Sequence, residues 1–224
     1  MNTADKLRKD AEAVWKKIVG HPFVVELYTG DLPIEKFTFY ILQDYHYLIA
    51  AMKNFGLMAS KASSVEAMRE VIDILHLEAT SEFDGYEELL NRLGYSIQDA
   101  SEIEPLPSTI SYSSFLLSIS SLESYAEAIT SVLPCFWSYA EIAEYHKDRL
   151  STNPNQLYKD WAMVYTADPY LKLVEKMKKL VNEAGKGFSY KKLYSVFIKA
   201  SRYEYMFWDS VYHKTNWPDE AKKL

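Results

Sequence analysis

Apolar residues recur at steps of three and four along most of this chain, as they do on one face of an α-helix. Prolines and glycines fall mostly between these periodic stretches, where helices begin or end. No stretch alternates apolar and polar residues between hairpin turns, so the sequence predicts an all-α protein. The expected helices cover residues 4–19, 34–59, 65–93, 122–150, 156–166, 169–183 and 190–213.

Two segments between the expected helices lack a clear helical pattern. Residues 23–30 are expected to form a short connector, and the polar residues 95–107, with two prolines, are expected to form the longest loop. Apolar periodicity resumes at Ile110 without a change in composition, which favours a single domain over residues 1–224. Because the helices are uneven in length and interrupted, we expect a bundle of kinked helices.

The most unusual helical stretch runs from Leu133 to Glu141 and holds the only cysteine. A proline inside a helix removes one backbone donor and collides with the preceding turn, so a bend is expected at Pro134. Cys135 and Tyr139 are four residues apart and share one face of this helix. The residue types alone allow two interpretations, a buried core cysteine or a thiol that lies beside a phenol in a pocket.

Two acidic residues lie among aromatic side chains in the expected helices. Asp44 shares a helix face with Tyr47. Glu204 shares a face with Trp208 in the last helix. An apolar setting raises the pKa of a carboxyl toward the range that is useful for proton transfer. The alternatives are a solvated carboxylate for Asp44 and an ion pair with a basic neighbour such as Arg202 for Glu204.

Composition and spacing disfavour several kinds of site and partner. The five histidines form no His-x-x-x-His pair and no Glu-x-x-His set, so a metal site is not expected. The net charge is −6, from 25 basic and 31 acidic side chains spread along the chain, which argues against nucleic acid as a partner. The N-terminus does not resemble a signal peptide, and no apolar run is long enough to span a membrane. We therefore expect a cytoplasmic protein with no membrane partner.

Six segments, taken together and in this order, resemble the TenA family, also called thiaminase II or aminopyrimidine aminohydrolase. They are His21-Pro22-Phe23, Leu42-Gln43-Asp44-Tyr45-His46-Tyr47, Ser111-Tyr112-Ser113, Leu133-Pro134-Cys135-Phe136-Trp137, Trp161 to Tyr165, and Tyr203-Glu204-Tyr205-Met206-Phe207-Trp208. The resemblance covers essentially the whole chain. It implies a heme-oxygenase-like all-α fold that binds no haem, needs no cofactor and assembles as a homotetramer.

The same resemblance implies a reaction and a set of site residues. Family members hydrolyse the bond between the methylene arm of an aminopyrimidine and its leaving group, which is ammonia or the thiazolium of thiamin. The product, 4-amino-5-hydroxymethyl-2-methylpyrimidine, is salvaged for thiamin synthesis. Cys135 matches the nucleophile that adds to the ring, Glu204 matches the acid/base, and Asp44 matches the acid that orients the ring. The residues that match pocket tyrosines are Tyr47, Tyr112, Tyr139 and Tyr165.

One segment departs from the family pattern. Many relatives have a glutamate followed one turn later by a histidine in the region that is Glu78 to Asp84 here, and Phe83 takes the place of that histidine. The departure further disfavours a metal-dependent oxidase on this fold and leaves the expected catalytic set intact. The main alternative to a hydrolase is a non-catalytic or regulatory protein that binds pyrimidine or thiamin. The sequence leaves open which leaving group is preferred.

Overall fold

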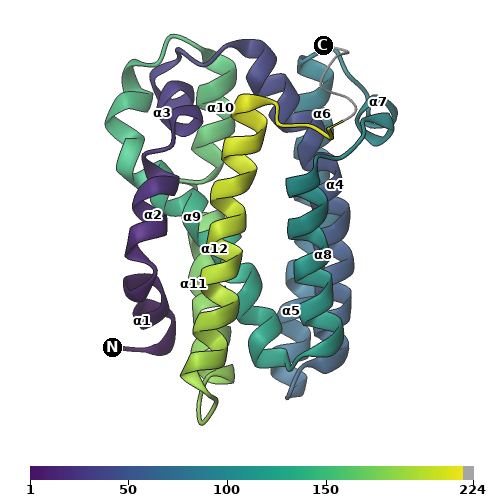
Figure 1. Cartoon of the computed structure of the whole chain (residues 1–224), viewed down its shortest axis with the longest axis vertical. Helices are drawn as coiled ribbons and strands as arrows, with labels where there is room; N and C mark the ends of the chain where they lie inside the picture. Colours follow the sequence, from purple (N-terminus) through teal and green to yellow (C-terminus); the bar gives the residue numbers. More distant parts are fainter. Residues whose placement is uncertain (219–224) are drawn as a thin grey trace. The chain divides into compact units, whose positions relative to one another are not determined.

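The fold consists of helices, and the structure, a computed structural model, describes residues 1–218 (Figure 1). No strand and no helix long and apolar enough to cross a membrane occurs in that range. The prediction of an all-α protein is therefore confirmed. The helices are α1 (Thr3–Asp10), α2 (Glu12–Val19), α3 (Pro22–Thr29), α4 (Ile34–Lys61), α5 (Val65–Leu77), α6 (Phe83–Arg92), α7 (Ile97–Glu102), α8 (Pro107–Leu122), α9 (Tyr125–Thr152), α10 (Gln156–Val164), α11 (Asp168–Ala184) and α12 (Tyr190–His213), with a π-helical segment η1 (Glu78–Glu82) between α5 and α6.

Two segments that were expected to be irregular are helical, and local capping explains both. Residues 23–30 belong mostly to α3, where Pro22 occupies the first turn and the Nδ1 of His21 accepts the backbone N–H of Phe23 at 3.2 Å. The expected loop 95–107 contains α7, which begins with a reciprocal capping box between Ser96 and Asp99. The connector prediction and this part of the loop prediction were wrong.

Two expected helices are interrupted. The helix expected over residues 4–19 is divided at Ala11 into α1 and α2. The helix expected over residues 65–93 changes to π-helical geometry at η1, and it continues as α6 through Gly85. At η1 the hydroxyl of Thr80 donates to the carbonyl oxygen of His76 at 2.6 Å, a side-chain bond that competes with the regular helical pattern.

Residue contacts divide the chain into two compact units. The first unit contains Met1–Pro33 and Ala126–Asp209, and the second contains Ile34–Tyr125 and the residues from Ser210 onward. The single domain over residues 1–224 stays a prediction, and residues 219–224 lie outside the described part of the chain.

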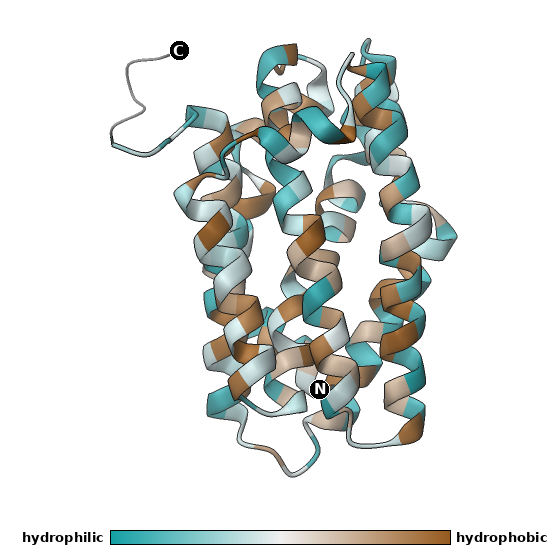
Figure 2. Cartoon of the chain, turned by 90° about the vertical axis from the view of Figure 1, so that its right-hand side faces the viewer, coloured by the Kyte–Doolittle hydropathy of each residue, from teal (hydrophilic) through white to brown (hydrophobic). Residues whose placement is uncertain are grey.

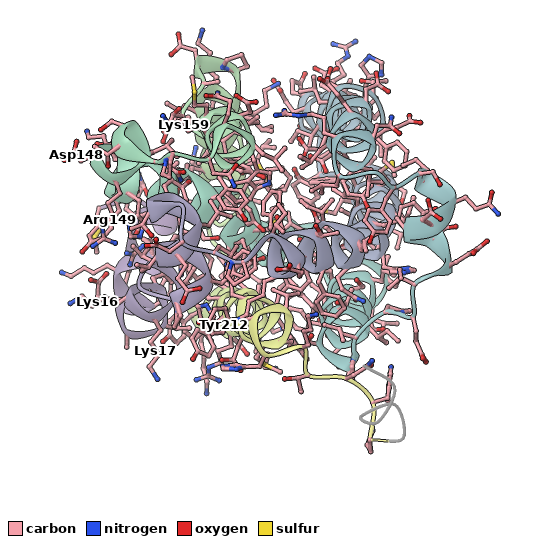
Figure 3. All side chains as sticks on the ribbon, turned by 90° about the horizontal axis from the view of Figure 1, so that it is seen from above. Lys16, Lys17, Asp148, Arg149, Lys159 and Tyr212 are labelled. Carbon is pink, nitrogen blue, oxygen red and sulfur yellow. The ribbon has the colours of Figure 1, made fainter. Side chains whose placement is uncertain are left out.

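The first unit is held by helices whose apolar faces are buried. In α2, Trp15 and Ile18 are buried, whereas Lys16 and Lys17 point away from the ribbon (Figure 3). The indole N–H of Trp15 donates to the hydroxyl of Ser201 in α12 at 3.0 Å, so this buried polar group is satisfied. The mixture of apolar and polar positions along the individual helices is visible in Figure 2.

The second unit is organised around α4, which lies beside α5 and α8 (Figure 1). Near its start, the Oε1 of Gln43 accepts the backbone N–H of Leu106 at 2.9 Å, just before α8 begins. At its end, the ammonium of Lys61 donates to the carbonyl oxygens of Ser121 and Glu123, each at 2.7 Å, where α8 ends. The contact of Gln43 precedes that of Lys61 along α4, and their partners follow in the same order along α8, so the two helices run parallel.

Gly30 ends α3 in the left-handed conformation, with φ of 89°. A Cβ there would lie 2.6 Å from the Oδ1 of Asn153, whose amide donates to the carbonyl oxygen of Leu27 at 2.8 Å. We expect Gly30→Ala to lower the free energy of unfolding by about 2–3 kcal/mol, from backbone strain plus the collision. Gly94→Ala is the matched control, because Gly94 has φ of 83° with no atom within 4 Å of its Cβ position, and about 1 kcal/mol is expected.

Denaturant unfolding of both variants measures the difference. Equal losses for Gly30→Ala and Gly94→Ala would contradict the role given to Asn153.

Candidate active site

The residues that the sequence predicts for the site fall into two sets, one in each unit. The first unit holds the predicted nucleophile, the predicted acid/base and two tyrosines, which are Cys135, Glu204, Tyr139 and Tyr165. The second unit holds the predicted ring-orienting acid and two tyrosines, which are Asp44, Tyr47 and Tyr112.

Helices α9 and α12 run parallel within the first unit. Near the start of each helix, the ammonium of Lys192 lies 3.9 Å from the carboxylate of Glu127. Further along, the rings of Tyr139 and Trp208 have centroids 5.3 Å apart. Both residue numbers increase from the first contact to the second, which fixes the direction of the pair.

The contact between Tyr139 and Trp208 lies one turn beyond the predicted nucleophile and one turn beyond the predicted acid/base. Cys135 is one turn before Tyr139 and on the same face of α9. Glu204 is one turn before Trp208 and on the same face of α12. The rings of Tyr139 and Trp208 contact each other, so each of the two predicted residues shares a helix face with one side of this contact. The thiol is partly exposed and Glu204 is 2% exposed.

An aromatic cluster adjoins these two residues. The ring of Tyr139 lies 4.8 Å from that of Tyr165 and 6.1 Å from that of Trp161, measured between centroids. The ring of Tyr165 contacts Tyr170 at 5.0 Å, and the hydroxyl of Tyr170 donates to the carbonyl oxygen of Phe136 at 2.9 Å. The structure thus brings Tyr139 and Tyr165 together beside the cysteine turn, as the resemblance implies for pocket tyrosines.

The turn that carries Cys135 is braced from several sides. The hydroxyl of Ser138 donates to the carbonyl oxygen of Cys135 at 3.3 Å. The indole of Trp137 packs edge-on against Trp15 at 5.7 Å. Pro134 lies inside α9, which continues as a helix to Thr152, and the bend expected there stays a prediction.

A salt bridge between Arg8 of α1 and Glu141 of α9 lies further along α9 than Cys135. The guanidinium of Arg8 donates through Nε to the Oε2 of Glu141 at 2.8 Å and through a second nitrogen to Oε1. The same guanidinium lies 4.4 Å from the ring of Trp15. Burial acts to lower the pKa of Arg8, but the hydrogen bonds that Arg8 donates to Glu141 and Glu12, together with the charges of these carboxylates, outweigh it and raise the pKa. These contacts fix the side of α9 on which Trp137 lies.

The set in the second unit is built around parallel helices α4 and α8. The rings of Tyr47 and Tyr112 have centroids 5.2 Å apart, and Tyr112 is buried. Gln43, next to Asp44, donates to the carbonyl oxygen of Glu104 at 3.0 Å in addition to accepting from the start of α8. Gln43 therefore fixes the register that brings Tyr47 to Tyr112. Sequence reasoning gave it no role, although a glutamine among apolar neighbours is a signal of a bound polar group.

Three histidines, two of them in the family-like segments, make contacts that hold the fold. His21 caps α3, and its Nε2 lies 3.6 Å from a carboxylate oxygen of Asp209. The Nε2 of His46 lies 2.7 Å from the carbonyl oxygen of Ile103. The Nε2 of His146 lies 2.8 Å from the carbonyl oxygen of Val19, and burial lowers the pKa of His146. Within residues 1–218 no group of three or more His, Cys, Asp and Glu side chains is arranged to hold a metal ion.

A buried acid that sequence reasoning left without a role lies in the second unit. Glu78 begins the π-helical segment η1 and is 8% exposed. Burial raises the pKa of Glu78 to about 8, and the negative charges of Glu82 and Asp44 act in the same direction. Asp44, the predicted ring-orienting acid, is thus electrostatically coupled to a second carboxyl.

Comparison with known proteins gives consistent matches over nearly the full length. Residues 8–214 match the model of the TENA/THI-4/PQQC family. An aminopyrimidine aminohydrolase of Halalkalibacterium halodurans is 33% identical over 220 residues, covering 97% of this chain and 98% of its own. One of Bacillus subtilis is 30% identical over 237 residues, covering 100% and 95%.

Solved structures agree with these matches. A TenA homologue from P. horikoshii OT3 superposes with a TM-score of 0.92 and 42% identity, over 95% of this chain and 99% of the other. A domain of unknown function from Shewanella denitrificans, described as having a heme oxygenase-like fold, superposes with a TM-score of 0.77 at 17% identity, over 94% of this chain and 92% of the other. The second similarity concerns the fold alone, and the heme-oxygenase-like fold predicted from the sequence is confirmed.

Proposed function

We infer the function of this chain from the premise that it belongs to the TENA/THI-4/PQQC family. Three of its relatives, at 30–33% identity over nearly their full length, carry the name aminopyrimidine aminohydrolase. The chain is accordingly a hydrolase of thiamin salvage, of the thiaminase II type. The observation that best supports chemistry in this chain itself is the parallel α9/α12 pair, in which the contact of Tyr139 with Trp208 lies one turn after a thiol and one turn after a buried carboxyl.

The proposed reaction proceeds by nucleophilic addition to the pyrimidine ring. The thiolate of Cys135 forms a C–S bond to a ring carbon, and the electron pair displaced into the ring expels the leaving group from the methylene arm. Glu204 protonates the departing amine. The Glu204 carboxylate then removes a proton from the water that adds to the methylene carbon, and the thiolate leaves as the ring is restored. This sequence needs no cofactor and no metal.

Asp44, Tyr47 and Tyr112 supply binding in this proposal, in the roles that the family resemblance implies. Asp44 holds the ring through its amino group and a ring nitrogen. Tyr47 and Tyr112, with ring centroids 5.2 Å apart, provide aromatic surface for a flat heterocycle. Tyr139 donates a hydrogen bond that stabilises the thiolate, since it lies one turn from Cys135 on the same face.

A steady-state assay of the wild-type protein tests the proposed function. The substrates are 4-amino-5-aminomethyl-2-methylpyrimidine and, separately, thiamin, and the release of hydroxymethylpyrimidine is followed. Turnover of the aminomethyl compound is expected, and the relative rate on thiamin identifies the preferred leaving group. A protein that binds hydroxymethylpyrimidine but hydrolyses neither compound would instead be the non-catalytic or regulatory binder.

We also propose that the protein acts as a cytoplasmic homotetramer. Support for self-association comes from an apolar face on α5, where Val65, Met68 and Ile72 are 58%, 37% and 47% exposed. These residues are three and four positions apart and therefore lie along one side of the helix. Exposed apolar groups that cluster in this way are typical of protein interfaces.

The oligomer proposal is tested by adding charge to this face. The double variant Met68→Glu/Ile72→Glu is expected to have a smaller molar mass than the wild type in light scattering after size exclusion, because buried unpaired carboxylates are costly. Lys16→Glu/Lys17→Glu is the matched control, since both residues are exposed on α2 in the first unit. A wild type that is monomeric, or a double variant of unchanged mass, would refute the role of this face.

A further inference from the structure

The linker between α7 and α8, residues 103–106, is held by two side chains of α4. The Nε2 of His46 lies 2.7 Å from the carbonyl oxygen of Ile103, and because a carbonyl oxygen only accepts, this nitrogen carries a proton. Gln43 donates to the next carbonyl oxygen at 3.0 Å and accepts the backbone N–H of Leu106 at 2.9 Å. Gln43 and His46 are three residues apart, so they hold the linker from one face of α4.

A third side chain, to which the proposed reaction gives no role, holds the linker from the other end of the second unit. The indole N–H of Trp217 donates to the carbonyl oxygen of Pro105, 112 positions earlier, at 3.2 Å. With this bond, every residue of the linker has a backbone group that is hydrogen-bonded to a side chain. Backbone groups outside helices and sheets need such partners. The position of the linker therefore depends on contacts between residues far apart in the chain.

A defined turn after α12 carries the chain to Trp217. Lys214 has the left-handed conformation, with φ of 52°, and the backbone N–H of Thr215 donates to the carbonyl oxygen of Ser210 at 2.9 Å. This is the pattern of a Schellman cap, which usually has glycine at the left-handed position. The left-handed conformation is strained in lysine, and the ammonium of Lys214 lies 5.6 Å from the centre of the Phe39 ring in α4. The turn thus keeps the segment of Trp217 beside the second unit.

The linker determines where α8 begins, and α8 carries part of the proposed ring-binding site. Helix α8 starts at Pro107, directly after the linker, and Tyr112 lies in its second turn. The ring of Tyr112 contacts that of Tyr47, with centroids 5.2 Å apart. Because the helix between the linker and Tyr112 is stiff, a shift of the linker moves this ring. On α4, Asp44 and Tyr47 each lie one position after a residue that holds the linker.

We propose that Trp217, Gln43 and His46 are positioning residues of the aminopyrimidine site. By holding the linker, they fix the spacing of Tyr47 and Tyr112, whose aromatic surface receives the pyrimidine ring. This proposal rests on the proposed function, and none of the three positioning side chains touches the substrate. Rings that are already in place need no reordering when the ligand binds, so the three residues contribute to affinity. Since the aminomethyl substrate and thiamin share the pyrimidine ring, the contribution is the same for both.

The variant Trp217→Phe tests the proposal, because phenylalanine keeps an aromatic ring and lacks the N–H. KM for the aminomethyl substrate is expected to rise about three- to tenfold, as for the loss of one hydrogen bond, while kcat stays within about twofold. The dissociation constant of hydroxymethylpyrimidine, measured by calorimetry, and the KM or inhibition constant of thiamin should rise by the same factor. Thr215→Val, at an exposed position of the same segment, is the matched control and should change none of these constants.

His46 allows a test by a conservative variant. His46→Gln keeps an N–H donor that reaches toward the carbonyl oxygen of Ile103, so KM should stay within about twofold of the wild type. His46→Leu removes the donor and should raise KM about as much as Trp217→Phe does. A purely structural role would instead lower the melting temperature of both His46 variants without separating KM from kcat.

The linker can also be followed without turnover. Hydrogen–deuterium exchange reports the opening of the backbone N–H of Leu106, which Gln43 accepts. Trp217→Phe should speed exchange in peptides that cover residues 103–106. Hydroxymethylpyrimidine should slow exchange there in the wild type, because ligand binding and the position of the linker are coupled in both directions. Peptides from α1, in the first unit, are the internal control.

The outcomes separate the two proposals. A wild type that binds hydroxymethylpyrimidine but hydrolyses neither compound refutes the proposed function, while the dissociation constants of the variants still decide the positioning role. Wild-type affinity in both Trp217→Phe and His46→Leu refutes the positioning role. A loss of kcat at unchanged KM, or a rise in KM for only one of the two substrates, refutes it as well, since the residues would then act on the chemical step or on the leaving group.

Discussion

Replacement of Cys135 by serine is expected to lower kcat/KM on the aminomethylpyrimidine at least ~100-fold, which is about 2.7 kcal/mol of transition-state stabilisation. The thiol is the nucleophile in the proposed addition, and a serine hydroxyl is almost fully protonated at neutral pH. Serine is also slightly smaller and polar, and it sits in a turn that Ser138 and Trp137 already brace. The fold should therefore survive. A steady-state assay of both proteins measures the loss.

Two controls separate catalysis from packing. Binding of hydroxymethylpyrimidine by Cys135→Ser should remain within a few-fold of the wild type, because the ring is held by other side chains in this proposal. The melting temperature should change little. If the variant keeps wild-type kcat/KM, Cys135 is a core residue and the nucleophilic mechanism is wrong.

Most of the fold could be predicted from the sequence, because helical periodicity and helix ends are local signals. The errors came where a cap or a side chain acts over a few residues. His21 and Pro22 start α3, and Ser96 with Asp99 starts α7. The hydroxyl of Thr80 accompanies the change to π-helical geometry at η1. None of these signals changes the apolar period on which the helix prediction relied.

The site was only partly predictable for a different reason. Residue types and the resemblance indicated Cys135 and Glu204, but no sequence rule states that α9 and α12 run parallel with Tyr139 against Trp208. That register depends on contacts between residues far apart in the chain. The burial of Glu78 is likewise a tertiary property, so its altered acidity could not be predicted from sequence.

The second large effect is expected at Glu204. Glu204→Gln should lower kcat by about 10²- to 10⁴-fold, because glutamine keeps the shape and can donate and accept hydrogen bonds but transfers no proton to the leaving amine. KM should change little, since the substrate ring is bound by other residues. Glu204 is buried, and glutamine fills the same volume without a charge, so the fold should be kept. Steady-state kinetics with the aminomethyl substrate measures both constants.

A neighbouring basic residue provides the control for this variant. If Glu204 served mainly as an ion-pair partner, then Arg202→Gln, at an exposed position of the same helix, would cost a similar amount. We expect Arg202→Gln to leave kcat within about twofold, as is usual for exposed charges. A loss in stability without a loss in kcat for Glu204→Gln would contradict the acid/base assignment.

The first unit is built from two segments that lie far apart in the sequence, and this has a consequence for biosynthesis. Met1–Pro33 leave the ribosome well before the second segment of their unit, which begins at Ala126. At roughly 5–20 residues per second, translation of residues 34–125 delays these partners by about 5–20 s. During that interval the apolar sides of α1 to α3 are uncovered, whereas residues 34–125, which make up most of the second unit, form one continuous segment. Nascent chains of this protein should therefore depend on holding chaperones from the first helices onward, and their yield should fall when translation of the middle segment is slowed.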